Sequence, residues 1–354
     1  MPIAASAAPT LASGIGMAIL VTGCAGFIGM HVSRALLARG EEVVGVDDCN
    51  AYYDPRLKEA RLAEIGLAGG RFRFHRLDFS DAAALDLAVK DERIDRIVHL
   101  GAQAGVRYSL EAPAAYVRSN LVGHANILEL ARGRAVKHLV YASSSSVYGS
   151  GAISPFSVDQ RADRPLSLYA ATKRADELMS ESYAHLFALP QTGLRFFTVY
   201  GPWGRPDMAM WLFTQAVLEG RPIRLFNQGA MRRDFTFVDD IVAGLLLVLD
   251  RPPEADGSVK PGGGQSPHAL YNIGNNRPEE LGRLVTLIEE ATGRPAIVER
   301  HPMQLGDMVE TCADIAPLTR DTGFQPRTTL AQGVPQFVDW YCSSIERNAP
   351  LSRP

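Results

Sequence analysis

Short apolar runs recur along the first half of the chain and are separated by segments of mixed polarity. Most runs have the length and the β-branched content of a buried strand, and the run at 72–77 alternates between apolar and polar residues. Together they span residues 18–22, 42–46, 72–77, 94–100, 136–142 and 193–200. After the first run, apolar residues repeat at helical spacing through Val32, Leu36 and Leu37. Strands that alternate with helices form parallel sheets with helices on both faces. The pattern therefore predicts an α/β fold with a doubly wound parallel sheet.

The alternation becomes irregular after a loop rich in proline and glycine at 201–206. Helical patterns resume at 210–218, at 238–249 and finally at 279–292. The helix at 238–249 is strongly apolar, so we expect it to pack back on the first sheet. Residues 252–267 are again rich in proline and glycine and predict a flexible excursion.

These changes of pattern predict two domains. We expect the main sheet domain over 17–198, with a returning segment at about 234–262, and a smaller C-terminal α/β domain for substrate mainly over 199–345. Residues 1–16 are expected to form a disordered leader and residues 346–354 a tail.

Composition and charge narrow the class of protein. The formal net charge is -3 with mixed signs, which disfavours a nucleic-acid surface. The four cysteines have neither paired nor metal-ligand spacing, so we expect a reducing, cytoplasmic compartment and no metal site. The first 16 residues resemble neither a signal peptide nor a membrane anchor, and we expect no membrane partner.

Three glycines follow the first apolar run, at Gly23, Gly26 and Gly29, with Phe27 and Ile28 between the last two. A strand, a glycine turn and a helix form the opening of a dinucleotide-binding unit. The glycines let the backbone approach a pyrophosphate, and the start of the helix offers unpaired N–H groups to it.

The second run ends on Asp47 and Asp48. A carboxylate at this position can accept hydrogen bonds from both ribose hydroxyls of an adenosine, and it would repel a ribose phosphate. The next basic residue is Arg56, so the sequence favours NAD over NADP. A solvated turn at the end of a strand would also explain Asp47.

Two later runs end on residues that suit a cofactor. Asp78 and Phe79 follow the third run and could contact an adenine, and small residues after Leu100 let a cofactor lie across the sheet edge. Asn120, within a helical pattern at 116–131, either caps cofactor phosphates or is merely exposed.

The stretch from Ser143 to Lys173 carries the candidate chemistry. It begins with four consecutive serines and ends with Tyr169 and Lys173, one helical turn apart on the same face. A tyrosine loses its proton near pH ~10, and an ammonium held close to it favours the phenolate. The pair is a candidate proton-transfer device, although a buried tyrosine beside a surface lysine has the same spacing.

Five longer segments together resemble the nucleotide-sugar epimerases of the extended short-chain dehydrogenase/reductase family, and within them the enzymes that act on UDP-glucuronate. These segments span residues 99–109, 143–149, 167–173, 197–208 and 231–235. The resemblance covers nearly everything from Met17 to about Tyr341. Gly101 and Cys312 depart from the family, which usually has alanine and tryptophan at these positions.

The resemblance implies that NAD stays bound and that Tyr169, Lys173 and Ser144 are catalytic. Tyr169 would take the proton of the 4-hydroxyl while NAD accepts hydride from carbon 4, and the 4-keto sugar would receive it back on the other face. Lys173 would hold the nicotinamide ribose, and Ser144 would hydrogen-bond the reacting oxygen. The implied cofactor contacts are Gly23, Gly26, Phe27, Ile28, Gly29, Asp47, Asn50, Asp78, Phe79, Leu100, Ala102, Gln103, Asn120, Tyr169 and Lys173.

Ser145 and Ser146 discriminate among related chemistries. Related dehydratases carry Asp-Glu at these two positions, and related decarboxylases carry a glutamate at the second. A hydroxyl cannot replace such an acid or base near neutral pH. We therefore expect the 4-keto intermediate to be reduced, with no net redox change.

The resemblance also implies the substrate contacts. Ser145, Ser146, Thr198 and Arg205 would receive the sugar carboxylate, with Arg205 as a charged fork, although it could be a surface residue of its loop. The nucleotide would be held by Phe226, Asn227, Arg233 and Asp307. Arg107 is either a further anion ligand or a plain surface arginine.

The resemblance thus implies conversion of UDP-glucuronate to UDP-galacturonate at carbon 4. Two alternatives stay open: a UDP-glucose/UDP-galactose 4-epimerase, and a non-catalytic NAD-binding regulator on the same fold. The family habit also implies a homodimer through the helices that correspond to residues 116–131 and 169–188.

Overall fold

The computed structural model describes residues 16–303 and 308–347 of the chain. The predicted leader and tail therefore lie almost wholly outside the described residues. Asp307 lies outside them as well.

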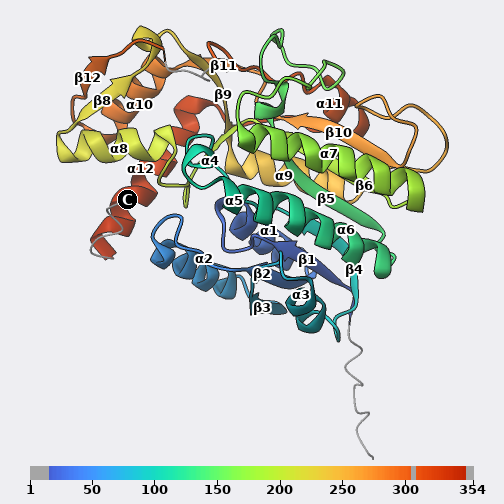
Figure 1. Ribbon diagram of the computed structural model, residues 1–354. Helices are drawn as coiled ribbons and strands as arrows, with labels where there is room; N and C mark the ends of the chain where they lie inside the picture. Colours follow the sequence, from blue (N-terminus) through green and yellow to red (C-terminus); the bar gives the residue numbers. More distant parts are fainter. Residues whose placement is uncertain (1–15, 304–307, 348–354) are drawn as a thin grey trace, which may run out of the picture.

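Seven parallel strands form the central sheet in the order β10-β6-β5-β4-β1-β2-β3 (Figure 1). Their bounds are β1 (Ala18–Thr22), β2 (Glu42–Asp47), β3 (Phe72–Arg76), β4 (Ile94–His99), β5 (His138–Ser144), β6 (Gln191–Phe196) and β10 (His268–Ile273). The chain order reverses between β1 and β4, which is the switch point of a doubly wound sheet. The predicted fold class is confirmed.

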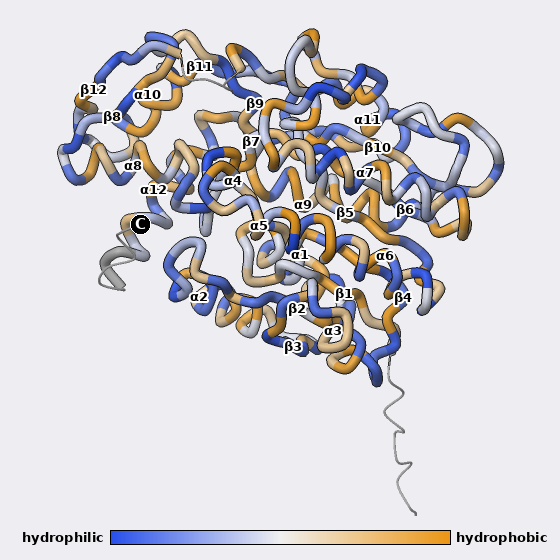
Figure 2. Tube along the Cα trace, in the orientation of Figure 1, coloured by the Kyte–Doolittle hydropathy of each residue, from blue (hydrophilic) through white to orange (hydrophobic). Residues whose placement is uncertain are grey.

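Helices cover both faces of this sheet. One layer contains α1 (Phe27–Ala38), α2 (Pro55–Leu67) and α9 (Val238–Leu249), and the other contains α3 (Ala82–Ala88), α6 (Gly123–Gly133) and α7 (Leu168–Phe187). The two layers explain why the strands read as continuous apolar runs. In β1, Ile19 and Val21 join the hydrophobic core on the α1 side, and Ala18 and Leu20 join the core on the α6 side. Figure 2 shows the hydrophobic residues concentrated along these inner elements.

A second lobe lies beside the carboxyl end of the sheet. It holds a three-stranded sheet of β7 (Thr198–Tyr200), β9 (Arg232–Phe237) and β11 (Pro278–Glu280), and a pair of β8 (Pro222–Leu225) and β12 (Ile297–Arg300). Its helices are α8 (Ala209–Glu219), α10 (Leu281–Thr292) and α12 (Leu330–Arg347). Trp211, Leu284 and Phe337 belong to a core of its own.

Several predicted elements differ from the structure. The strand expected at 193–200 is two strands, because the chain turns at Phe197 and β7 enters the smaller sheet. The returning segment does not end near 262, since β10 completes the large sheet. All six residues of β10 are buried, but polar His268 and Asn272 interrupt its apolar residues, so the sequence shows neither a continuous apolar run nor a regular alternation. The helix at 279–292 is not the last, because α11 (Ala316–Thr322) and α12 follow it. The two-domain division itself stays a prediction.

The helix expected at 116–131 is interrupted. It consists of α5 (Pro113–Tyr116), a π-helical segment η1 (Val117–Val122) and α6. The wider turn lies where Phe79 packs against the helix, since a Cβ on Gly123 would lie 2.3 Å from the Phe79 ring. A π-helical turn often marks a functional position, and this one contains Asn120.

Candidate active site

The candidate site is built at the carboxyl edge of the large sheet. Gly23 follows β1, Asp47 ends β2, Asp78 follows β3, and Ser144 ends β5. The segment from Leu100 to Gln103 follows β4. Because parallel strands bring their carboxyl ends to one edge, residues far apart in sequence meet there.

The glycine turn leaves no room for side chains. Gly23 has a φ of +69°, and a Cβ on it would lie 2.7 Å from the backbone nitrogen of Gly101. A Cβ on Gly29 would lie 2.0 Å from the carbonyl oxygen of Gly23. No side chain caps the start of α1, and its first turn contains no acidic residue. The turn therefore fits the pyrophosphate of a dinucleotide.

Asp47 is buried between the glycine turn and α2. Its carboxylate accepts hydrogen bonds from the backbone nitrogens of Ala25 at 3.1 Å and Cys49 at 2.8 Å. Burial raises the pKa of Asp47, although Lys58 favours the charged form. This environment contradicts the solvated turn that the sequence left open.

Lys58 corrects the sequence argument about the cofactor. Its ammonium lies 3.7 Å from Asp47 and donates a hydrogen bond to Asn50 Oδ1 at 3.2 Å. The absence of a nearby basic residue was therefore a wrong premise, because α2 folds Lys58 back onto the end of β2. We still expect NAD rather than NADP, because the Asp47 carboxylate would repel a ribose phosphate. Lys58 shares the buried face of α2 with Leu57, Arg61 and Ile65, a pattern that is too weak in the sequence to reveal the contact.

The residues expected near the adenine are engaged within the protein. Asp78 pairs with Arg118 at 2.8 Å. Phe79 is buried, with its ring edge-on to His99 at a centroid distance of 5.3 Å. Both side chains are close to the strand end but already have protein partners.

Asn120 is buried, so it is not the merely exposed residue that the sequence allowed. Its Oδ1 accepts from the backbone nitrogen of Gln103 at 2.8 Å, and its amide donates to the Gln103 carbonyl at 3.1 Å and to Thr172 Oγ1 at 2.9 Å. Asn120 thus links the segment after β4 to α7. This amide positions the segment that contains Gln103.

Helix α7 presents the predicted catalytic pair. Ser167 caps its start by accepting from the backbone nitrogen of Ala170 at 3.1 Å, so Tyr169 lies in the first turn. The ring of Tyr116 contacts Tyr169 edge-on at 6.1 Å. Lys173 is only 2% exposed, and its ammonium lies 3.1 Å from Asp176. The alternative of a surface lysine is therefore wrong.

The serine run alternates between two environments. Ser143 points away from the edge and donates to Glu177 at 2.6 Å. Ser144 Oγ donates to Ser146 Oγ at 3.1 Å and accepts from the Ser146 backbone nitrogen at 3.2 Å. Ser144 pairs in register with Phe196 of β6, and Thr198 starts β7 just beyond. The hydroxyl residues therefore lie on neighbouring chain segments.

Arg205 lies inside a polar cluster. Its Nε and Nη2 bind the two oxygens of Asp207 at 3.0 and 2.5 Å, and the Tyr52 hydroxyl donates to Asp207 at 3.2 Å. Burial acts to lower the pKa of Arg205, but Asp207 outweighs it and raises that pKa, with smaller contributions from Tyr52 and Tyr169. Arg205 is therefore a paired, mostly buried residue within electrostatic reach of Tyr169.

The residues expected at the nucleotide end come from both lobes. The Arg107 guanidinium lies over the Phe226 ring at 5.7 Å. Asn227 donates to the Ala230 carbonyl at 2.8 Å, and Arg233 Nη1 donates to the Arg232 carbonyl at 3.0 Å. The Arg107–Phe226 contact joins two residues that the sequence could not relate.

Arg61 is a structural residue that sequence reasoning missed. It is fully buried and donates to the Trp203 carbonyl at 2.6 Å, to the Gly204 carbonyl at 3.0 Å and to the Ala25 carbonyl at 3.3 Å. It thereby ties the glycine turn to the loop before Arg205. An arginine in the apolar stripe of α2 was the only signal for it.

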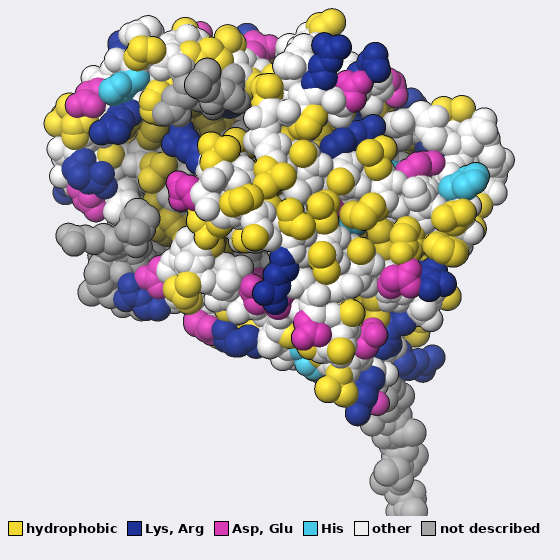
Figure 3. Space-filling view, in the orientation of Figure 1, with side chains coloured by type: hydrophobic (Ala, Val, Ile, Leu, Met, Phe, Trp, Pro, Cys, Tyr) yellow, Lys and Arg dark blue, Asp and Glu magenta, His cyan; other side chains and the backbone are white. Residues whose placement is uncertain are grey.

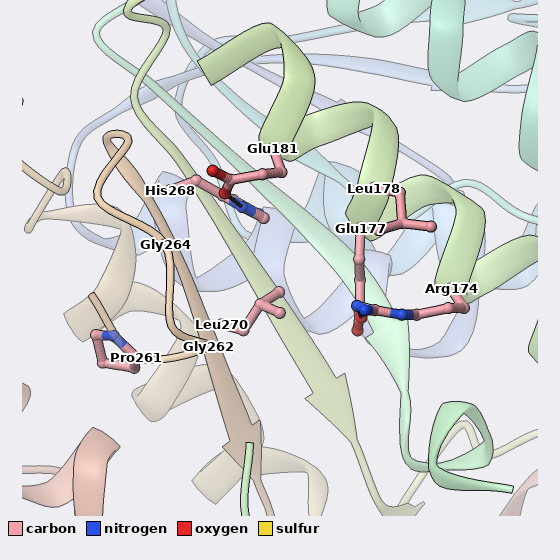
Figure 4. Close-up of a pocket in the computed structure, with 9 residues that line it drawn as sticks. All are labelled: Arg174, Glu177, Leu178, Glu181, Pro261, Gly262, Gly264, His268 and Leu270. Atoms are coloured by element: carbon pink, nitrogen blue, oxygen red, sulfur yellow. Dashed lines mark hydrogen bonds and ion pairs between the residues drawn. The ribbon is translucent and has the colours of Figure 1, made fainter. Parts of the chain in front are cut away.

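Other features lie away from this edge. A surface pocket lined by Arg174, Glu181, Pro261, Leu270 and their neighbours contains none of the predicted site residues (Figure 4). Within residues 16–303 and 308–347, no group of three or more His, Cys, Asp or Glu side chains could hold a metal ion. No helix in these ranges is long and apolar enough to span a membrane.

The chain was compared with known proteins. It is 47% identical over 337 residues to a probable UDP-glucuronate 4-epimerase of Rhizobium meliloti. The aligned residues cover 94% of this chain and 98% of the relative. It is 44% identical over 333 residues to UDP-glucuronate 4-epimerase 3 of Arabidopsis thaliana, which covers 92% of this chain and 76% of the relative.

Solved structures agree with these relatives. A UDP-glucuronic acid 4-epimerase from Bacillus cereus in complex with UDP-glucuronic acid and NAD matches with a TM-score of 0.79 and 32% identity, over 92% of this chain and 98% of that one. Residues 19–274 match the NAD dependent epimerase/dehydratase family. The chain therefore belongs to the NAD dependent epimerase/dehydratase family.

Proposed function

We propose that this chain converts UDP-glucuronate to UDP-galacturonate at carbon 4 and keeps NAD bound throughout. The observation that carries the proposal is a buried Lys173 one turn from Tyr169, beside a strand end with hydroxyls and no carboxylate at residues 144–146. The named UDP-glucuronate 4-epimerases among its relatives and structural neighbours support the same substrate.

Each of these side chains has a distinct task in the reaction. The phenolate of Tyr169 takes the proton of the 4-hydroxyl and later returns it, and the Lys173 ammonium favours that phenolate. Ser144 donates a hydrogen bond to the reacting oxygen. Bound NAD supplies the hydride acceptor and donor at carbon 4.

We assign the recognition of the sugar carboxylate to Arg205 together with Ser145, Ser146 and Thr198. Arg205 already binds one carboxylate, that of Asp207, in a two-pronged arrangement. An arginine offers further N–H donors beyond the two that Asp207 occupies. A held carboxylate also resists decarboxylation, because loss of carbon dioxide requires that bond to turn perpendicular to the adjacent keto group.

The test is to incubate the purified protein with UDP-glucuronate and no added cofactor, and to measure UDP-galacturonate. Product should form in the wild type, and a Tyr169→Phe variant that retains NAD should form none. A folded, NAD-loaded wild type without product would favour the binding-protein alternative. Faster turnover of UDP-glucose than of UDP-glucuronate would favour the galactose-type epimerase.

We further infer that two copies of the chain associate. Apolar side chains of Val117, Val122, Leu178, Leu186 and Phe187 are exposed on η1 and α7, and Figure 3 shows hydrophobic side chains gathered on this face. A contiguous apolar patch of this kind suits a two-fold interface. The mass at micromolar concentration should be that of a dimer, and a Leu178→Glu variant should be monomeric. A monomeric wild type would contradict the inference.

We also infer a reducing, cytoplasmic location. None of the four cysteines, all of which lie in the described part of the chain, forms a disulfide, as is usual in a reducing compartment. Cell fractionation of the tagged protein would test the inference.

A further inference from the structure

Two adjacent carboxylates on α7 have very different partners. Glu177 receives hydrogen bonds from Arg195, Arg174 and Ser143, and Figure 4 shows its contact with Arg174. Asp176 is completely buried, and in the described residues its Oδ2 is bonded to Lys173 at 3.1 Å while its Oδ1 has no hydrogen-bond partner. Glu177 is therefore a saturated structural group, whereas the only side-chain hydrogen bond of Asp176 to a described residue goes to the candidate catalytic lysine.

Within the described part of the chain, Lys173 is the only cation that acts on Asp176. Glu177 lies on the same helix, Tyr141 approaches from β5 and His124 from α6. Burial raises the pKa of Asp176 to about 6, and Lys173 opposes this effect. The Asp176 carboxylate and the Lys173 ammonium therefore stabilise each other's charge, because neither has another ionised partner of opposite sign among the described residues.

We propose, given the epimerase function above, that Asp176 is a positioning residue. It holds the Lys173 ammonium in place and tunes the electrostatic effect of that ammonium on Tyr169. A lysine has a flexible four-carbon stem, so its ammonium needs a fixed acceptor to stay at one place. The carboxylate holds the ammonium at 3.1 Å, and its negative charge weakens the attraction of the ammonium for the phenolate. Asp176 reaches the substrate only through Lys173.

Two variants separate the charge of Asp176 from its hydrogen bond. Asp176→Asn keeps the shape and an oxygen acceptor but removes the charge. Its kcat profile should move to lower pH by roughly one unit on both limbs, because the ammonium acts undiminished on the phenol and loses its own counter-ion. Asp176→Ala removes the acceptor, so kcat should fall roughly ten- to hundredfold while the KM for UDP-glucuronate stays within about twofold.

The matched control is Glu181→Gln on the same helix. Glu181 binds His268 at 2.8 Å (Figure 4), and its substitution removes the same charge away from Lys173. This control should retain the wild-type pH profile. If both limbs of the kcat–pH profile of Asp176→Asn stayed at their wild-type positions, the proposal would be overturned, even if the thermal stability changed. A purely structural role predicts that result.

The amount of NAD retained per purified chain gives a second readout that does not depend on turnover. Asp176→Ala should retain less NAD than Glu181→Gln, because a Lys173 side chain without a fixed acceptor no longer holds the nicotinamide ribose. If the wild type makes no UDP-galacturonate, the proposed function fails and this comparison alone decides the role of Asp176. Equal retention in that case would overturn the positioning role. If Asp176→Ala does not fold, the pH profile of Asp176→Asn decides.

Discussion

The Glu177 carboxylate on α7 receives two hydrogen bonds from the Arg195 guanidinium on β6, from Nε at 2.8 Å and from Nη2 at 2.9 Å. Both side chains are buried. Burial acts to raise the pKa of Glu177, but Arg195 outweighs it and holds that pKa below its usual value. This pair fixes the helix that carries Tyr169 and Lys173 against the sheet.

Replacing Glu177 with glutamine should destabilise the protein by about 3–5 kcal/mol, because Arg195 would remain buried without a counter-charge. The free energy of unfolding in urea measures the effect. Arg174→Ala is the control, since Arg174 also binds Glu177 but is partly exposed, and it should cost about 1 kcal/mol or less. Equal losses in the two variants would refute a special role of the Glu177–Arg195 pair.

Gly29→Ala should abolish NAD retention. The new Cβ would lie 2.0 Å from the Gly23 carbonyl oxygen, so the turn would have to open and the start of α1 would shift. Cofactor content after purification measures the loss. The control is Gly66→Ala in α2, where a Cβ meets nothing within 4 Å. This substitution should stabilise the helix by roughly 0.5–1 kcal/mol. Full NAD content in Gly29→Ala would show that the turn is not the cofactor site.

Arg205→Ala should lower kcat/KM for UDP-glucuronate by about 10- to 100-fold, the range expected for loss of a charged hydrogen bond. Turnover of UDP-glucose, which lacks the carboxylate, should change much less. Arg221→Ala is a suitable control, because Arg221 pairs with Glu219 on the exposed surface of the same lobe. Unchanged kinetics with UDP-glucuronate would remove Arg205 from the carboxylate site.

His138 should make the fold sensitive to acid. Its ring is buried between the Leu249 carbonyl at 3.1 Å and Thr192 Oγ1 at 2.9 Å, and burial lowers its pKa to about 4. The unfolded chain binds a proton near pH ~6.5 and the folded chain does not. The contribution of His138 to the free energy of unfolding is therefore fully present above pH ~6.5. It is lost as the pH drops towards 4, which lowers that free energy by up to about 3 kcal/mol.

A His138→Gln variant should lose the His138 share of this pH dependence, because a neutral amide does not titrate, while the buried rings of His31, His99 and His124 keep theirs. Unfolding free energies at pH 7 and pH 4.5 for the wild type and the variant would measure the difference. The same slope in both proteins would mean that other groups cause the acid sensitivity.

Much of the site could be predicted from the sequence, because its chemistry depends on local patterns. The strand runs, the glycine turn and the helical spacing of Tyr169 and Lys173 all lie within short segments. A parallel sheet then brings the strand ends to one edge whatever the details of packing. The fold class and the cofactor edge followed from these patterns, and the catalytic roles and substrate contacts came from the family resemblance.

The tertiary structure decided the partners of each charged or polar side chain. Lys58 beside Asp47, Asn120 between Gln103 and Thr172, and Asp207 on Arg205 are contacts that periodicity does not encode. Strand β10 escaped detection because His268 and Asn272 interrupt its apolar residues, and these two polar side chains find their hydrogen-bond partners only in the folded chain. The sequence by itself determined which groups the edge carries, since local hydrogen bonding and hydrophobic spacing specify helices and strands. Only the tertiary structure determined the positions and the ionisation of these groups, because burial and pairing with residues distant in sequence depend on contacts in space.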